Sequence, residues 1–145
     1  MTGAGDRVAR ATQNVTAAGT TIQVRSTGDR QREDVMSVTG RAKRVRIYIS
    51  EDVKVGHRNA AIALLELLRS EGAHGATVFR GSAGFGPAGH LHVSHLVDVA
   101  QDLPLLVEWV DVPDAVERLL PRVLALVPRG LVTIEDTEIV HSSSQ

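Results

Sequence analysis

The sequence has no cysteine, few aromatic side chains and almost no net charge. Its 145 residues include one tryptophan, one tyrosine and two phenylalanines, and the formal net charge is −1. Without cysteine, disulfides and thiolate metal sites are excluded. Nucleic-acid-binding proteins usually carry an excess of lysine and arginine, which this chain lacks, so we expect no nucleic-acid partner. No apolar run approaches the ~18 residues of a membrane span, and no signal-peptide core is present, so we expect a cytoplasmic protein with no membrane insertion.

The apolar residues that are present suffice for one core. Hydrophobic residues make up 43% of the chain and charged residues 23%, as in ordinary globular proteins. Residues 1–40 differ, because glycines and polar residues surround isolated valines without a sustained period. So little apolar surface does not offset the entropy of ordering the segment. We therefore predict a disordered N-terminal tail over residues 1–40 and one folded domain over residues 41–141.

Hydrophobic periodicity predicts an α+β fold. Apolar residues alternate with polar ones over 43–50, whereas Asn59 begins a stretch with helical spacing that ends before Gly72. Asp111 or Val112 caps a second helix, and Pro121 should kink or split it. The remaining strands are expected over 76–81, 105–111 and 131–140. The order βαββαβ predicts a ferredoxin-like fold, a four-stranded antiparallel sheet with two helices on one face.

One face of this predicted sheet has a mixed composition. Alternation places its residues away from the helices, and the face is too apolar for solvent and too charged for a core. We interpret it as a subunit interface. Its expected members are Arg44, Arg46, Tyr48, Leu106, Glu108 and Val110.

The segment after the second strand is rich in glycine. Gly84-Phe-Gly-Pro-Ala-Gly89 matches the G-x-G-x-x-G pattern of dinucleotide-binding folds, but that pattern must open a helix, and Pro87 and the following residues show no helical period. A dinucleotide site is therefore not predicted. Two interpretations stay open: the loop amides form an anion-binding nest, or the segment is a hairpin tip that binds nothing.

Histidines follow this loop directly. His90 and His92 share a face of an extended segment and could chelate one metal ion, whereas His95 would need a turn to join them. The alternative is that these are exposed loop histidines, because structural zinc sites usually include cysteine. No nucleophile–base pair and no G-x-S-x-G elbow occurs in the sequence, so we expect no catalytic residues and no enzyme.

Several segments together carry a family resemblance. Between about Arg44 and Val140, the chain resembles a PII-like protein of the domain-of-unknown-function family numbered one hundred and ninety, relatives of the PII signalling proteins and CutA. The matching segments are Arg46-Ile-Tyr-Ile-Ser-Glu51, Gly75-Ala-Thr-Val-Phe-Arg-Gly81, Gly84-Phe-Gly86, Asp102-Leu-Pro-Leu-Leu-Val-Glu108 and Gly130-Leu-Val-Thr-Ile-Glu135.

The resemblance implies a homotrimer with nucleotide-binding clefts between its subunits. In PII proteins the base of the loop after the second strand borders such a cleft, and the matching residues here are Thr77, Gly84, Phe85 and Gly86. PII proteins also carry a Gly-Asp-Gly-Lys phosphate loop before the last strand, but this chain has Val127-Pro-Arg-Gly-Leu131 instead. Arg129 is left to supply one phosphate contact.

The sequence therefore predicts a non-enzymatic, PII-like trimeric regulatory protein. It would bind a small anionic effector at the intersubunit clefts and signal through a mobile loop over residues 82–95 to a membrane transporter or another regulated protein. The effector stays unidentified; ATP, ADP or another nucleotide is the candidate, and no cofactor is required. The alternative is a CutA-like trimeric metal-binding or structural protein that uses the loop histidines.

Overall fold

The computed structural model describes residues 11–17, 20–26, 35–87, 89, 91–93 and 102–143. The chain forms two compact units, one of Met1–Arg41 with Glu138–Gln145 and one of Ala42–Thr137. In the described part of the chain, no helix has the length and apolar character needed to cross a membrane. That residues 41–141 fold without the preceding segment stays a prediction.

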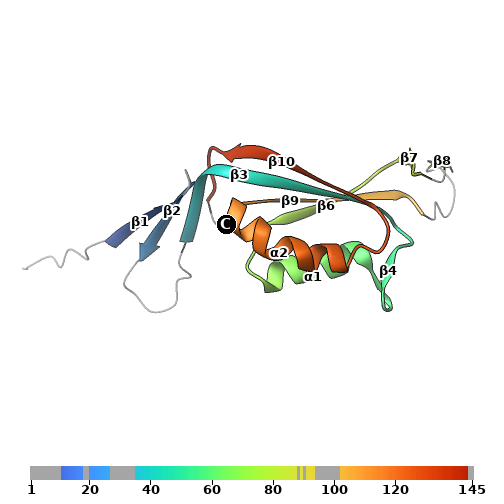
Figure 1. Ribbon diagram of the computed structural model, residues 1–145, viewed down its shortest axis with the longest axis horizontal. Helices are drawn as coiled ribbons and strands as arrows, with labels where there is room; N and C mark the ends of the chain where they lie inside the picture. The colour runs from blue at the N-terminus through green and yellow to red at the C-terminus, as the bar shows by residue number, and fades with distance from the viewer. Residues whose placement is uncertain are drawn as a thin grey trace, which may run out of the picture. The chain divides into compact units, whose positions relative to one another are not determined.

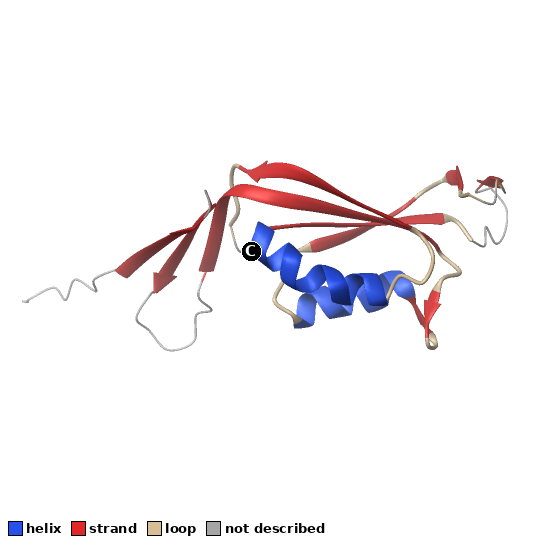
Figure 2. Ribbon diagram, in the orientation of Figure 1, coloured by secondary structure: helices blue, strands red, loops and turns tan. Residues whose placement is uncertain are grey.

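The larger unit confirms the ferredoxin-like fold. Its strand order is β10–β3–β9–β6, and both helices cover one face of the sheet (Figures 1 and 2). β3 pairs antiparallel with β9, and β9 pairs antiparallel with β6. The elements are β3 (Val35–Ser50), α1 (Ala60–Ser70), β6 (Ala76–Arg80), β9 (Pro104–Asp111), α2 (Pro113–Ala125) and β10 (Leu131–Ile139).

The core lies between the sheet and the helices. Alternation along β3 and β9 places Val45 opposite Trp109 and Ile47 opposite Val107, and all four side chains are fully buried. The helical spacing of α1 and α2 brings their apolar faces onto this layer. The helices contribute Ala60, Ala61, Leu64, Leu68, Val116, Leu119 and Val123.

Local sequence signals explain the helix ends. Asn59 Oδ1 accepts a hydrogen bond from Ala61 N at 2.8 Å, as expected of an N-cap residue. Val112 is the N-cap of α2, with Pro113 in the first turn. Pro121 was predicted to kink or split the helix; the split is wrong, because α2 continues to Ala125, and the kink stays a prediction. Pro121 lies on the exposed side, and Val123 beyond it is fully buried, so packing holds the last turn in place.

Short strands complete the described chain. β4 (Lys54–Val55) pairs with β5 (Arg58–Asn59), and β7 (Ala83–Phe85) pairs with β8 (Leu91–Val93) inside the glycine-rich loop. In the smaller unit, β1 (Ala11–Ala17) pairs with β2 (Thr20–Ser26), and β2 pairs with residues 35–40 of β3.

These N-terminal strands were not predicted from the sequence. The segment expected to be disordered contains β1, β2 and the first part of β3. The register aligns Val15, Ile22 and Val38 across the three strands, and Val38 is fully buried. Each strand alone carries only isolated apolar residues, so this alignment exists only once the strands pair.

Candidate functional site

The base of the glycine-rich loop packs against the start of β9. Gly81 N donates a hydrogen bond to Pro104 O at 2.8 Å. A Cβ added at Gly81 would lie 2.7 Å from Pro104 Cγ, and one at Gly84 would lie 2.9 Å from the same atom. Real Cβ contacts are longer than this, so both positions require glycine for close packing. The two glycines therefore hold the loop base at this end of the sheet.

Beyond the base, the loop continues as an exposed hairpin. Gly84 pairs with His92 and Phe85 with Leu91 across β7 and β8. The Phe85 side chain is 76% exposed, and nothing lies within 4 Å of a Cβ added at Gly86. Gly89, at φ +73°, donates its N–H to Gly86 O at 2.9 Å and closes a turn. Phe85 and the Gly86 backbone are thus open to a ligand or partner.

The loop before β10 reaches the same end of the sheet. Gly130 has φ +148°, and a Cβ there would lie 2.5 Å from Tyr48 O, so only glycine lets the chain pass this strand. Arg129 just before it is exposed and forms no ion pair with the described residues. Tyr48 and the glycine-rich loop belong to one end because Ser50, two residues on, is the partner of Pro104.

The predicted site residues therefore divide into three places. Gly84 lies at the loop base, next to Pro104 of β9, and Phe85 and Gly86 follow it in the exposed hairpin. Arg129 precedes Gly130, which lies beside β3 at the same end of the sheet. Thr77 instead lies inside β6, opposite Glu108 on the face away from the helices. β3 and β9 therefore lie between the strand that follows Arg129 and the strand that precedes the glycine-rich loop.

The metal prediction falls largely outside the described residues. His90 is not described, and His92 is described only through its backbone pairing with Gly84. Within the described ranges, no group of three or more His, Cys, Asp and Glu side chains is placed to hold a metal ion. The metal-binding alternative stays a prediction.

The sheet face opposite the helices carries an ion-pair network. Arg46 Nε donates to Glu108 Oε2 at 2.9 Å, and Arg46 Nη1 donates to Glu135 Oε1 at 3.0 Å. Arg44 lies farther away, with Nε 3.9 Å from Glu108 Oε2 and Nη1 3.7 Å from Glu135 Oε2. The hydrogen bond to Glu108 raises the pKa of Arg46. The two arginines and two glutamates have no net charge together, so the face can be covered without burying net charge.

An apolar row crosses the same face nearer the loop end. The register places Phe79, Leu106 and Tyr48 directly across β6, β9 and β3. Phe79 is 50% exposed and Tyr48 40% exposed, while Leu106 is half-buried. Exposed aromatic side chains aligned in a row beside paired charges are typical of an interface between proteins.

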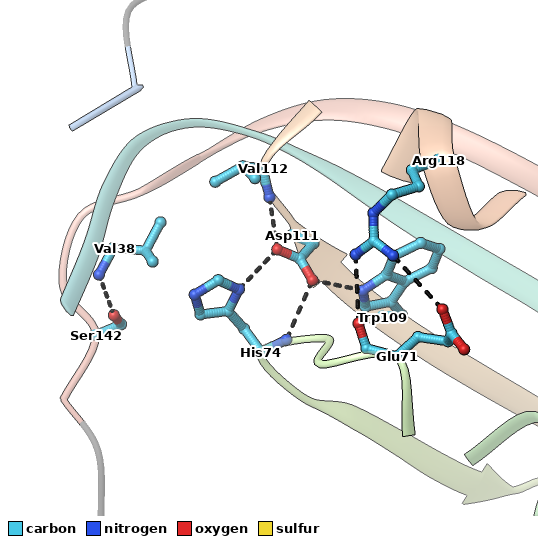
Figure 3. Close-up of polar contacts among 8 residues, drawn as sticks. All are labelled: Val38, Glu71, His74, Trp109, Asp111, Val112, Arg118 and Ser142. Atoms are coloured by element: carbon cyan, nitrogen blue, oxygen red, sulfur yellow. Dashed lines mark hydrogen bonds and ion pairs between the residues drawn. The ribbon is translucent and has the colours of Figure 1, made fainter. Parts of the chain in front are cut away.

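A buried carboxylate at the other end of β9 was missed by the sequence analysis (Figure 3). Asp111 is fully buried, and its Oδ2 accepts from His74 N and Trp109 Nε1, each at 3.1 Å. Its Oδ1 accepts from Val112 N at 2.9 Å and lies 2.7 Å from His74 Nδ1. Alternation with Leu105, Val107 and Trp109 already places Asp111 on the inner face, and that signal could have identified it.

The pKa values of this pair shift in opposite directions. The hydrogen bond to Asp111 raises the pKa of His74, and burial opposes this only in part. Burial alone would raise the pKa of Asp111, but the hydrogen bonds from His74 and Trp109 outweigh it and lower that pKa. The pair therefore favours a charged Asp111 beneath a partly exposed His74, and it joins the loop after α1 to the start of α2.

Comparison with known proteins identifies the family. The family model DUF190, described as uncharacterized ACR, matches residues 42–139, which is more than half of the chain. The chain belongs to the DUF190 family. This confirms the resemblance found in the sequence, and the N-terminal strands β1 and β2 lie outside the matched region.

Two curated relatives each match about two thirds of the chain. A UPF0166 protein of Aquifex aeolicus is 33% identical over 99 residues, which are 68% of this chain and 93% of the relative. A UPF0166 protein of Methanocaldococcus jannaschii is 29% identical over 100 residues, which are 68% of this chain and 92% of the relative. The match covers nearly the whole length of both relatives.

A solved structure shows the same fold. CPII, a nitrogen regulatory PII-like protein from Thiomonas intermedia K12, was solved bound to ADP, AMP and bicarbonate. It is 20% identical to this chain, the match covers 70% of this chain and 90% of CPII, and the TM-score is 0.50. The DUF190 domain described here therefore has a PII-like fold.

Proposed function

We propose that the protein is a non-enzymatic PII-like regulator, a homotrimer that binds a small anionic effector at its subunit clefts. An adenine nucleotide is the leading candidate. The observation that carries this proposal is that two loops lie at one end of the sheet, on opposite sides of β3 and β9. One is the glycine-rich base next to Pro104. The other contains exposed Arg129 and ends at Gly130, which lies next to Tyr48.

The local chemistry fits an anion. Gly86 carries no side chain and leaves its backbone open to close approach, and Phe85 offers an exposed aromatic ring on which a purine base can stack. Arg129 supplies a cation for phosphate. The fold is that of CPII, whose structure contains ADP and AMP, and this agreement supports a nucleotide as the ligand class.

Assembly would bring the two loops together. In one chain they are separated by the width of β3 and β9, so a cleft that uses both requires a second copy. The mixed face of the sheet supports such an assembly, because its charges are paired and its apolar row is half-exposed. The loop over residues 82–95 would then signal to a membrane transporter or another regulated protein.

The site chemistry supports binding rather than catalysis. His74 and Asp111 form a close pair, and the donors to Asp111 are His74, Trp109 and Val112, as in a structural contact. The pair ties together two loops at the end of β9 opposite the glycine-rich loop.

The proposal is tested by sedimentation equilibrium and by thermal shift with ATP, ADP and AMP. We expect a trimer and a raised melting temperature with at least one nucleotide, at an affinity in the micromolar range or weaker, about −8 kcal/mol at best. Gly86→Val should abolish binding, because a branched side chain would occupy the space that the ligand needs. The matched control is Gly75→Val, which also has nothing within 4 Å of its Cβ and lies before β6.

Arg129→Ala should weaken binding of a phosphate-bearing ligand by about 1.5–3 kcal/mol, the contribution of one charged hydrogen bond. If no nucleotide raises the melting temperature at millimolar concentration, the nucleotide proposal is wrong, and the loop is a protein-docking element alone.

A further inference from the structure

An ion pair lies directly before the glycine-rich loop. Arg80 is the last residue of β6, and its Nη2 donates to Glu51 Oε2 at 2.9 Å. Glu51 follows the last residue of β3, so the pair joins the ends of two strands that have β9 between them. The Arg80 side chain is 52% exposed and the Glu51 side chain 33% exposed. Both members of the pair are therefore within reach of a ligand in solution.

The backbone on each side of this pair is fixed by other contacts. Glu51 O accepts a hydrogen bond from Asn59 Nδ2, the N-cap residue of α1, at 2.8 Å. Gly81, next to Arg80, donates its N–H to Pro104 O at 2.8 Å. Neither of these hydrogen bonds uses the Glu51 carboxylate or the Arg80 guanidinium. The Glu51 side chain can therefore turn away from Arg80 while the two strand ends keep their positions.

A ligand anion can replace Glu51 at little cost in stability. An ion pair with this exposure contributes little to folding, because water screens the charges and two flexible side chains must be held in one geometry. A guanidinium binds phosphate through two parallel N–H···O bonds. A terminal phosphate also carries more negative charge than one carboxylate. Arg80 should therefore favour a phosphate over the carboxylate of Glu51.

Arg80 also lies where the proposed site needs a cation. It comes directly before Gly81 and close to Gly84, the two glycines at the loop base. Arg129, by contrast, precedes β10, and β3 and β9 separate β10 from β6. We infer that Arg80 binds a phosphate of the effector, and that Glu51 is a competing anion that occupies this arginine in the free protein. This inference rests on the proposed function and names the cation on the side of the glycine-rich loop.

Calorimetric titration with ADP and with inorganic pyrophosphate tests the exchange. Arg80→Gln should weaken the binding of both probes at least about ten-fold, because a charged donor is lost. Glu51→Gln should tighten binding about two- to five-fold, since the competing carboxylate is gone. In the double variant the gain from Glu51→Gln should disappear, because no arginine is left to release. Arg80→Lys keeps the charge and should bind more tightly than Arg80→Gln; it also serves if Arg80→Gln fails to fold.

A second ion pair with similar exposure is the matched control. Arg122 Nη1 contacts Glu71 Oε1 just after the end of α1, and these side chains are 54% and 26% exposed. Glu71→Gln and Arg122→Gln change the net charge by the same amounts as the test variants. They should leave both affinities unchanged, because Glu71 follows the C-terminal end of α1 whereas Glu51 precedes its start. An equal change in the control variants would show a general charge effect and would overturn the inference.

The outcomes distinguish the inference from the proposed function. If ADP binds the wild-type protein and binds Arg80→Gln equally well, the inference is overturned and the proposed function stands. If Glu51→Gln leaves the affinity unchanged or weakens it, Glu51 is not a competitor and the inference is wrong. If pyrophosphate binds through Arg80 but ADP does not bind, the inference holds and the nucleotide proposal fails. If neither probe binds even the Glu51→Gln variant, both fail.

Discussion

The two ends of β9 differ in how they contact the rest of the chain. At its C-terminal end, the carboxylate of Asp111 is fully buried and is surrounded by donors from His74, Trp109 and Val112. At its N-terminal end, Pro104 packs against two glycines, and the chain beyond them extends as a hairpin with Phe85 76% exposed. One end is closed by polar contacts within the chain, and the other leaves its surface open.

We therefore expect the C-terminal end of β9 to matter for the stability of the fold and the N-terminal end to matter for binding. Asp111 joins the loop after α1 to the start of α2, so its contacts hold the helices on the sheet. At the open end, Asp102 has φ +71°, a conformation that few residues other than glycine adopt, just before β9 begins. Strained backbone is tolerated where the surrounding structure holds it and is common at binding sites. Substitutions at the two ends should therefore affect different measurements.

The largest expected effect is at the closed end. Asp111→Asn should lower the free energy of unfolding by about 3–5 kcal/mol, because the amide turns a donor toward buried donors and removes the charge that pairs with His74. Urea denaturation measures this loss. Asp114→Asn is the control, since Asp114 is exposed in the first turn of α2 and should cost less than about 1 kcal/mol. Equal losses in the two variants would contradict the role of Asp111.

A smaller loss is expected beside the open end, at Gly130. Gly130→Ala should cost about 2–3 kcal/mol, because its Cβ would lie 2.5 Å from Tyr48 O at φ +148°. Gly56→Ala is the matched control, since Gly56 also has positive φ, +61°, but nothing lies within 4 Å of its Cβ. If Gly56→Ala loses as much stability, the cost comes from the positive φ alone and not from the contact with Tyr48 O. Thermal unfolding of both variants decides between these causes.

The groups that make stability depend on pH, His74 and Asp111, also lie at the closed end. The pKa of His74 is raised above 6.5 in the folded protein, so its contribution is complete below that pH and is lost as the pH rises through the folded value. The pKa of Asp111 is lowered below 3.8, so its contribution is present above that pH and is lost as the pH falls through the folded value. Stability should therefore be greatest between these limits.

Urea denaturation across this pH range checks the assignment. His74→Gln should flatten the decline on the alkaline side, whereas His57→Gln, at an exposed position, should leave it unchanged. A decline that persists in His74→Gln would assign the pH dependence to another group.

The smallest effect on stability is expected at Phe85. Because its side chain is 76% exposed, Phe85→Ala should change the free energy of unfolding by no more than about 0.5 kcal/mol. The same variant should weaken nucleotide binding if the ring stacks on the base. A large loss of stability would show that the hairpin packs on the domain and would remove the contrast between the two ends of β9.

Much of the fold could be predicted from local sequence signals. Two local signals span only a few residues each: the alternation of Val45, Ile47 and Ile49, and the cap at Asn59. They can therefore be recognised without knowing the partner strands. The strands β1 and β2 were missed because their apolar residues align only after pairing. Whether α2 continues through Pro121 could not be decided from the sequence for a related reason, since burial of Val123 is a tertiary contact.

The sequence by itself determined the family, the order of the four main strands and two helices of the ferredoxin-like domain, and the residue types of the glycine-rich loop. Those features depend on neighbours in the chain and on motifs. Only the tertiary structure decided that Gly84 and Gly130 reach one end of the sheet on opposite sides of β3 and β9. It also decided that Arg46 takes the hydrogen bonds of Glu108 and Glu135 and leaves Arg44 without them. Both outcomes depend on strand order and register, which join residues far apart in the chain.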